Sequence, residues 1–178
     1  MNPIIRFIVT LLSASLASRI GVNEVTHIRM RVCPNDLDLN MHMTNARYLA
    51  IFDIAGIEFL IRLGLGRLML RRGLRPLIGG RIIRHRFGLR PFEQFTVSTR
   101  ILCWDDKWFY FDQRMETRKG TAAIVLTKGL VRDRDPARTI RPDELLQSLG
   151  AEQKTTSTAP EVSQWLAAEQ MLRVEDDC

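Results

Sequence analysis

The stretch Asp36-Leu37-Asp38-Leu39-Asn40-Met41-His42-Met43-Thr44-Asn45-Ala46-Arg47-Tyr48 decides how the rest of the sequence is interpreted. It contains two acids, two amides, an imidazole and a phenol, and the longest apolar periodic segment of the chain begins at its end. The first backbone N–H groups of a helix have no partner inside the helix and attract negative charge. We therefore expect a reaction centre at a helix entrance, with the remainder of the chain as its scaffold.

A helix is expected directly after this stretch, over residues 46–63. Thr44 or Asn45 is suited to cap its start, and Gly64 or Gly66 is suited to close its end in the left-handed conformation. The apolar residues of this segment recur at spacings of three and four: Leu49, Phe52, Ile54, Ala55, Phe59, Leu60 and Leu63. So broad an apolar face predicts a central helix that is embraced by a sheet.

Alternating apolar and polar residues predict five strands. The first, at residues 25–33, precedes the motif and places His27 on its solvent face. Aromatic residues lie on both faces of the strand expected at residues 108–117, and we expect these faces to meet the core or a subunit interface. Short connections between the last four strands predict consecutive antiparallel hairpins. These strands are expected at residues 78–87, 94–104, 108–117 and 121–132.

Length and composition favour one globular domain with a core that needs neither disulfides nor metal, because the chain has 178 residues, 46% of them apolar and 26% charged. The three cysteines, Cys33, Cys103 and Cys178, are widely separated and form no C-x-x-C pair. Reduced thiols are therefore expected, with Cys103 in the core, and no metal site is expected.

The net charge of +6 favours anionic partners. Nine arginines and no lysine lie between Arg62 and Arg90. They form either a solvated basic face or a contact surface for a phosphorylated substrate carrier or an acidic membrane. Nucleic acid is not an expected partner, because the sequence has no zinc-finger spacing, RNA-binding aromatic motif or basic zipper.

Three parts are expected along the chain: an N-terminal helical segment at 1–22, the central domain at 23–150, and a linker with an amphipathic helix at 151–178. The first segment has a short apolar run followed by small residues, which gives it a faint likeness to a signal peptide. We expect it to be a helix packed on the domain, with export or membrane-surface anchoring as the alternative. A short helix is expected at residues 142–149, a polar linker at 153–160 and a final helix at 161–173.

The motif resembles two families with the hotdog fold, an α+β fold in which a curved antiparallel sheet wraps a central helix. Asp38-Leu39-Asn40-Met41-His42 followed by Asn45 is similar to the D-x-N-x-H-x-x-N segment of plant acyl-carrier-protein thioesterases. Asp38, Tyr48 ten residues later, and Phe52 to Leu60 resemble the D…Y…F-E-x-A-R-x-E-x-L pattern of the 4-hydroxybenzoyl-CoA thioesterase family. The resemblance covers residues 25–135, and the chain differs from the second pattern at Gly56, where the pattern has arginine.

The resemblance implies a thioesterase of fatty acid metabolism that hydrolyses an acyl-CoA or acyl-carrier-protein thioester without a cofactor. Asp38 would act as base or nucleophile, the backbone N–H near Asn45 would polarise the carbonyl, and Asn40 and His42 would orient water or substrate. Tyr48 would line the site. Arg84, Arg86 and Arg90 would bind the phosphates of the carrier. The family also implies a homodimer or homotetramer, and a cytoplasmic location is expected.

Other interpretations of the same residues stay open. Asp38 and Asn40 are also residues that cap turns, and His42 is also suited to pack at the helix start. A hydroxyacyl-thioester dehydratase is a second enzyme class, although His42 precedes the helix and Glu58 lies sixteen residues further on. A non-catalytic hotdog module that binds acyl chains or a membrane surface is the third alternative. Chain length, aromatic or aliphatic preference, and CoA or carrier protein are not determined by the sequence.

Overall fold

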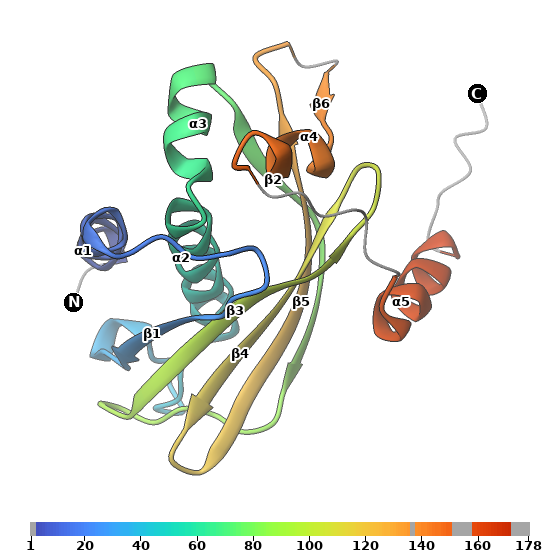
Figure 1. Cartoon of the computed structure of the whole chain (residues 1–178). Coiled ribbons are helices and arrows are strands. Elements are labelled where there is room, and N and C mark those ends of the chain that lie inside the picture. Colours follow the sequence, from blue (N-terminus) through green and yellow to red (C-terminus); the bar gives the residue numbers. More distant parts are fainter. Residues whose placement is uncertain (1–2, 136–137, 151–157, 172–178) are drawn as a thin grey trace.

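Helix α2 (Asn45–Arg62) forms the centre of the computed structural model, which describes residues 3–135, 138–150 and 158–171. It lies in the hollow of a curved antiparallel sheet (Figure 1). Thr44 caps its start, because its side-chain oxygen accepts a hydrogen bond from the N–H of Arg47 at 3.3 Å. Gly64 follows its end with a φ of +94°, which a glycine adopts without strain. The predicted central helix and both of its end signals are confirmed.

The sheet has the order β1-β3-β4-β5-β2, and a short β6 also pairs with β5. Every pairing is antiparallel. This is the hotdog fold that the motif predicts. The strands are β1 (Thr26–Arg31), β2 (Arg75–His85), β3 (Gln94–Trp104), β4 (Phe109–Thr117), β5 (Gly120–Arg132) and β6 (Thr139–Ile140).

The prediction that the last four strands form consecutive hairpins is wrong for its first pair. β3–β4 and β4–β5 are hairpins, but β2 pairs with β5 and leaves β3 to pair with β1. The connection at residues 86–93 is long enough to cross the mouth of the sheet, where Leu89 is fully buried and its backbone bonds to the motif. The glycine and proline in this connection therefore did not indicate a hairpin. The connection instead makes buried contacts with residues of the motif, which are distant in sequence.

The two faces of the sheet are covered differently. The inner face packs on α2 through residues such as Phe95, Val97 and Met115. Part of the outer face is covered by α5 (Pro160–Gln170), in which Trp165 meets Tyr110 edge to face at a centroid distance of 6.4 Å (Figure 1). The predicted C-terminal helix is confirmed over its described residues, and its positions 172–173 lie outside them. Positions 153–157 of the predicted linker also lie outside the described residues.

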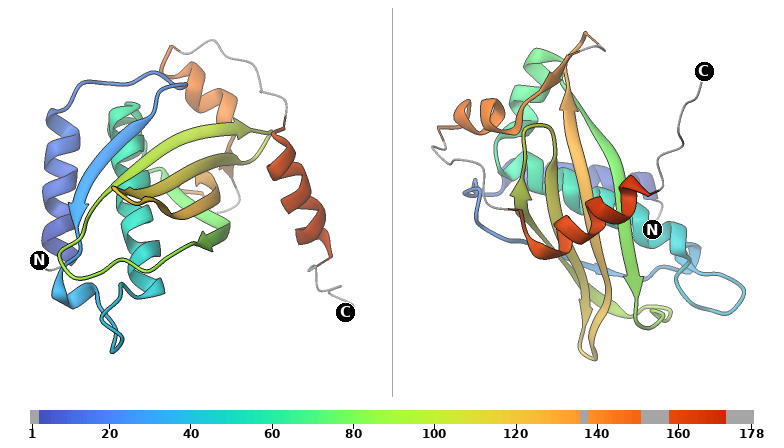
Figure 2. Two further views of the ribbon diagram at one scale, coloured as in Figure 1. Left: turned by 90° about the horizontal axis from the view of Figure 1, so that it is seen from below. Right: turned by 90° about the vertical axis from the view of Figure 1, so that its right-hand side faces the viewer.

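Three further helices flank this core. α1 (Pro3–Leu16) lies alongside α2 near β1 (Figure 2), and α4 (Pro142–Gln147) forms where a short helix is predicted. α3 (Leu65–Arg72) was not predicted, because it has only eight residues between two glycines with positive φ. Its buried Leu65 and Met69 extend the core beyond α2. Within the described part of the chain, no helix has the length and apolar character needed to cross a membrane.

Candidate active site

The motif folds into a tight loop whose centre is Asp38. A bridge between Leu37 and Met43 closes the loop, and the N–H of Asp38 donates to the carbonyl of His42 at 2.9 Å. Oδ1 of Asp38 accepts hydrogen bonds from the N–H groups of Asn40, at 2.9 Å, and His42, at 3.1 Å. One carboxylate oxygen therefore fixes the loop, as the turn-capping interpretation expects.

The second oxygen of Asp38 remains free for chemistry. Among the described residues, Oδ2 makes no hydrogen bond or ion pair, and the residue is exposed. The loop leads through Thr44 directly into α2, where Asn45 and Ala46 are the first residues of the helix and exposed. Their N–H groups belong to the first turn, which has no intrahelical acceptor to offer them. A carboxylate and the positive end of a helix thus stand at the two ends of one short loop.

The other three polar residues of the motif have different environments. Asn40 is exposed and contributes its backbone N–H to Asp38. Asn45 is exposed at the helix start. His42 is partly buried and packs on the backbone of Gly88, where a Cβ atom would lie 2.7 Å from Cδ2 of the imidazole ring. The structure therefore brings Asp38, Asn40 and His42 together through backbone hydrogen bonds.

Tyr48 joins the motif to the crossing connection. It is buried, and its hydroxyl accepts a hydrogen bond from the N–H of Leu89 at 3.1 Å. Its ring meets His85 edge to face at 4.7 Å. Burial raises the pKa of the Tyr48 hydroxyl above its ordinary value, so that the group stays neutral. Tyr48 is thus a residue that positions the wall behind the site.

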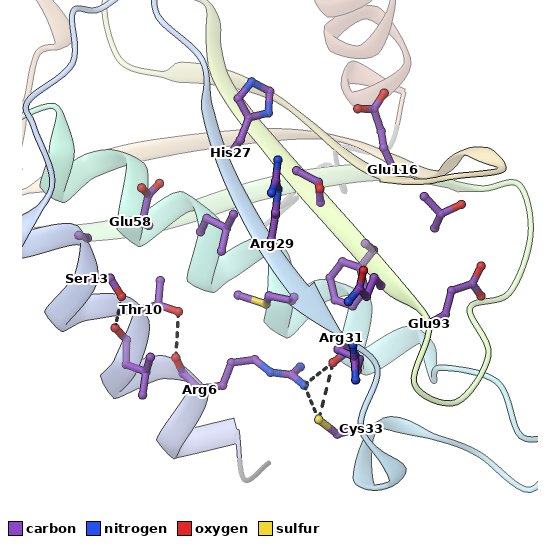
Figure 3. A pocket seen from close by; sticks show the side chains of 18 of the residues that line it. Arg6, Thr10, Ser13, His27, Arg29, Arg31, Cys33, Glu58, Glu93 and Glu116 are labelled. Atoms are coloured by element: carbon purple, nitrogen blue, oxygen red, sulfur yellow. Dashed lines mark hydrogen bonds between the residues drawn. The ribbon is translucent and has the colours of Figure 1, made fainter.

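Asp36, the first residue of the motif, is a buried anchor. Its Oδ2 accepts hydrogen bonds from Nη2 of Arg6 and from the N–H of Cys33, both at 2.9 Å. Nε of Arg47 lies 3.6 Å from Oδ1. Figure 3 shows the Arg6 side chain reaching from α1 toward β1 and Cys33, where it also donates to the carbonyl of Arg31 at 3.2 Å. This ion pair ties α1 to the loop that carries Asp38.

The three candidate phosphate-binding arginines lie on β2 and on the connection that follows it. Arg81 contacts Asp53 of α2 and His85 contacts Tyr48 of α2, so the odd-numbered side chains of β2 face the helix. Side chains alternate along a strand. Arg84 therefore lies on the outer face, and the β2–β5 ladder continues through the N–H of Arg86. Arg90 is exposed in the crossing connection near Gly88.

Asp38 lines neither of two clefts, of about 1570 and 1040 Å³, that flank α1. The first cleft, of about 1570 Å³, runs between α1 and β1 and is lined by Arg6 and Glu58 (Figure 3). Glu58 is 6% exposed and is bound to Arg62 at 3.4 Å through Oε1, while its Oε2 has no partner among the described residues. The Asp38 carboxylate therefore lies on an exposed surface of this chain. No group of three or more His, Cys, Asp or Glu side chains suited to a metal occurs in residues 3–135, 138–150 or 158–171.

Sequence reasoning missed two contributors to this region, Arg6 and His85. Arg6 lies thirty positions from Asp36, and nothing local to either residue indicates the pairing. His85 lies in the strand predicted at residues 78–87, but no role was predicted for it. Side chains alternate between the two faces of a strand, so Ile83, His85 and Phe87 share one face. Because Ile83 and Phe87 are apolar and suited to the inner face, the sequence could have placed His85 beside the helix.

Comparison with known proteins identifies the family. Residues 32–168 match the model of the Thioesterase-like superfamily. Protein THEM6 of Xenopus laevis is 35% identical over 81% of this chain and 70% of its own length. The probable thioesterase YBR096W of Saccharomyces cerevisiae is 31% identical over 73% of this chain, but the match spans only 57% of the yeast protein.

Solved structures of low identity share the fold. The probable thioesterase YbaW of Escherichia coli superposes with a TM-score of 0.64 at 19% identity, over 72% of this chain and 98% of its own. SAV2348 of Staphylococcus aureus, solved in complex with CoA, gives a TM-score of 0.66 at 18% identity, over 82% and 96% of the two chains. The motif loop, the central helix and every strand of the curved sheet except β1 fall within residues 32–168, and the chain belongs to the Thioesterase-like superfamily.

Proposed function

We propose that this protein is a thioesterase that hydrolyses an acyl-CoA or acyl-carrier-protein thioester to the free acid and the thiol. The observation that carries the proposal is the Asp38 carboxylate, which is held through one oxygen and free at the other, beside the start of α2. Membership of the superfamily supports the reaction class. The CoA complex of SAV2348, a structural neighbour, supports a CoA thioester as substrate.

The chemistry follows from these two groups. Asp38 accepts a proton from a water molecule while the water oxygen attacks the thioester carbonyl. The N–H groups at the start of α2 stabilise the negative charge that develops on the carbonyl oxygen. Collapse of this intermediate breaks the C–S bond, and the leaving thiolate takes up the proton. Asn40 and His42 orient the water or the acyl group from the same loop.

Direct attack by Asp38 is the alternative route, in which an acyl–aspartyl anhydride forms and water then cleaves it. A single turnover in ¹⁸O-labelled water separates the two routes. Attack by water places the label in the acid product. Attack by Asp38, followed by hydrolysis at the aspartyl carbonyl, leaves the label in the side chain of Asp38, where mass spectrometry of peptides detects it.

A homodimer completes the site in this proposal. β2 pairs only with β5, so its other edge offers unpaired backbone groups, and Leu77, Ile78 and Ile82 on it are 40–52% exposed. The loop tip adds Leu39, which is fully exposed. Pairing of β2 with its copy would continue the sheet and cover the open surface beside Asp38. Ile82→Lys is expected to shift the protein toward monomers in sedimentation analysis and to reduce hydrolysis, whereas a monomeric wild-type enzyme with full activity would refute this part.

The exposed arginines near the site bind the phosphates of the carrier in this account. Arg90 is the nearest in one subunit, while Arg84 and Arg86 meet a carrier that extends over the sheet edge. Arg90→Gln is expected to raise KM severalfold with little change in kcat, and rising salt should reduce the difference between variant and wild type. A KM that does not depend on salt would contradict the assignment.

The function is tested with a panel of acyl-CoAs that covers short, long and aromatic acyl groups. Hydrolysis is measured as the release of free thiol. We expect turnover of at least one class, and we expect Cys103→Ala to retain it because that thiol is buried away from the motif. Absence of turnover on every acyl-CoA and acyl-carrier-protein substrate would refute the proposal.

A further inference from the structure

The outer surface of α1 is unusually apolar for an exposed helix. Six large aliphatic side chains on it are 48–89% exposed: Ile4, Ile5, Ile8, Val9, Leu12 and Leu16. At 3.6 residues per turn they occupy one continuous arc of about 140°. Surface helices of globular proteins normally turn such an arc toward the core. Contiguous exposed apolar surface of this kind marks an interaction site.

The orientation of α1 is fixed by its opposite face. Arg6, Thr10 and Ala14 recur at a spacing of four and are at most 8% exposed. Arg6 is bound to the buried Asp36, so rotation of the helix about its axis would break this ion pair and expose its partner. The apolar arc therefore points away from the domain, because the opposite face of α1 is held against the domain by Arg6.

A basic groove borders this arc. We call it the α1–α3 groove: a cleft of about 1040 Å³ between α1, α2 and α3, which Leu11 and Ser15 of α1 join to the edge of the arc. Its floor is apolar, with Leu60 and Met69 among its residues. Among the residues that the structure describes, no acid lines it, and five arginines do: Arg19, Arg62, Arg67, Arg75 and Arg134.

Most of these guanidinium groups are unoccupied. Arg62 is bound to Glu58 and to the carbonyl of Ser18. The side chains of Arg19, Arg67 and Arg75 make no hydrogen bond or ion pair with any part of the chain that the structure describes. The exposed Arg71 and Arg72 on α3 add to the same positive surface. The groove thus joins apolar surface to several free cations, which suits an anionic amphiphile.

We propose that this side of the molecule docks on an anionic phospholipid membrane, with α1 lying in the interface and the arginines of the α1–α3 groove on lipid phosphates. The 14 residues of α1 span about 21 Å at 1.5 Å per residue, which is too short to cross a bilayer core but sufficient to lie in its surface. A basic rim beside an apolar arc is the arrangement that attracts the helix to anionic lipid.

The charge distinguishes this occupant from a second copy of the chain. A two-fold dimer through α1 would bring the same surface of both subunits together, and hence two sets of free arginines without acids to pair with them. Such a contact costs repulsion. A lipid surface covers the apolar arc and supplies the anions at the same time.

Co-sedimentation of the full chain with vesicles tests the proposal. Vesicles of phosphatidylcholine alone are compared with vesicles in which about one third is phosphatidylserine, and binding to the anionic vesicles should be at least tenfold tighter at low salt. Ile8→Gln/Leu12→Gln should weaken binding to the anionic vesicles at least tenfold. Arg67→Gln/Arg75→Gln should weaken it by about tenfold and leave binding to the neutral vesicles unchanged.

Matched controls separate docking from general stickiness. Met171→Gln removes an apolar side chain that is 85% exposed directly after α5, and Lys107→Gln/Arg118→Gln removes two charges from the hairpin turns. Neither should change binding. Equal binding by all variants, or no binding of the wild type, would overturn the proposal. Self-association that is lost in Ile8→Gln/Leu12→Gln, without vesicle binding, would assign the surface to a second copy instead. Hydrolysis of a soluble short-chain acyl-CoA is measured in parallel and is expected to be unchanged in every variant.

Discussion

Replacing Arg6 with methionine tests whether the buried ion pair with Asp36 holds α1 against the site loop. Methionine keeps most of the apolar stem and removes the hydrogen bonds of Nη2 to Asp36, to the carbonyl of Arg31 and to the thiol of Cys33. Breaking a buried ion pair from one side costs about 3–5 kcal/mol. Here Asp36 keeps the N–H of Cys33 and the side chain of Arg47 at 3.6 Å, and the unpaired Nε of Arg6 is removed as well. We therefore expect a loss of about 2 kcal/mol in the free energy of unfolding.

Urea unfolding followed by far-UV circular dichroism measures this loss, which corresponds to a midpoint shift of about 1 M. Arg138→Met is the control, because its side chain is 63% exposed and its two ion-pair distances are 3.9 Å. It should cost less than about 0.5 kcal/mol. In the double variant Arg6→Met/Asp36→Asn, the loss should fall below the sum of the single losses by about 1 kcal/mol or more. Additive losses, or an Arg6→Met effect equal to that of the control, would refute the anchoring role.

Two further predictions concern buried polar groups of the sheet. Gln113→Leu should lower the free energy of unfolding by about 2 kcal/mol in urea titrations, because it leaves the carbonyl of Phe52 and the hydroxyls of Thr99 and Thr127 without their partner; a neutral effect would show that this network does not hold α2 to the sheet. Burial, with the hydrogen bond to Asp105, raises the pKa of Tyr110 above its value of 10.0 in the unfolded chain. The neutral hydroxyl therefore makes its full contribution to the free energy of unfolding below pH 10.0, and this contribution is lost as the pH rises above that value. Tyr110→Phe should accordingly unfold with a shallower loss of stability between about pH 9.5 and 11 than the wild type, and equal slopes would contradict the assignment.

The local patterns of this chain predicted its elements well, and its pairings less well. α2 was predicted from Thr44, Gly64 and a broad apolar face, because capping and helical periodicity depend on residues that are close in sequence. β3, β4 and β5 followed the same local logic. The partner of β2 did not, because the choice between β3 and β5 depends on how the crossing connection packs on Tyr48 and His42, which are some forty residues away in sequence.

The candidate site shows the same division. The position of Asp38 at the entrance of the helix was predictable from the motif. The role of Asp36 was not, because its partner Arg6 lies thirty residues away in the N-terminal helix, and the expected packing of that helix on the domain does not reveal which residues meet. The number of arginines between Arg62 and Arg90 did not predict their different environments. Arg81 is paired with Asp53, Arg84 lies on the outer face of the sheet, and Arg67 lines the α1–α3 groove. Charge runs do not reveal which face each side chain takes.

The central claim is that Asp38 performs the chemistry at the start of α2, and the rate of acyl-CoA hydrolysis by Asp38→Asn tests it most directly. Asparagine retains an oxygen that can accept the N–H groups of Asn40 and His42, so the loop should keep its shape and the unfolding midpoint should not change. Asp106→Asn, a change of the same kind in a distant hairpin turn, is the control. We predict that kcat falls at least about a hundredfold in Asp38→Asn and stays at the wild-type value in the control. A kcat within about threefold of wild type for Asp38→Asn would contradict the account, because a loss that small is far below what a general base or nucleophile contributes.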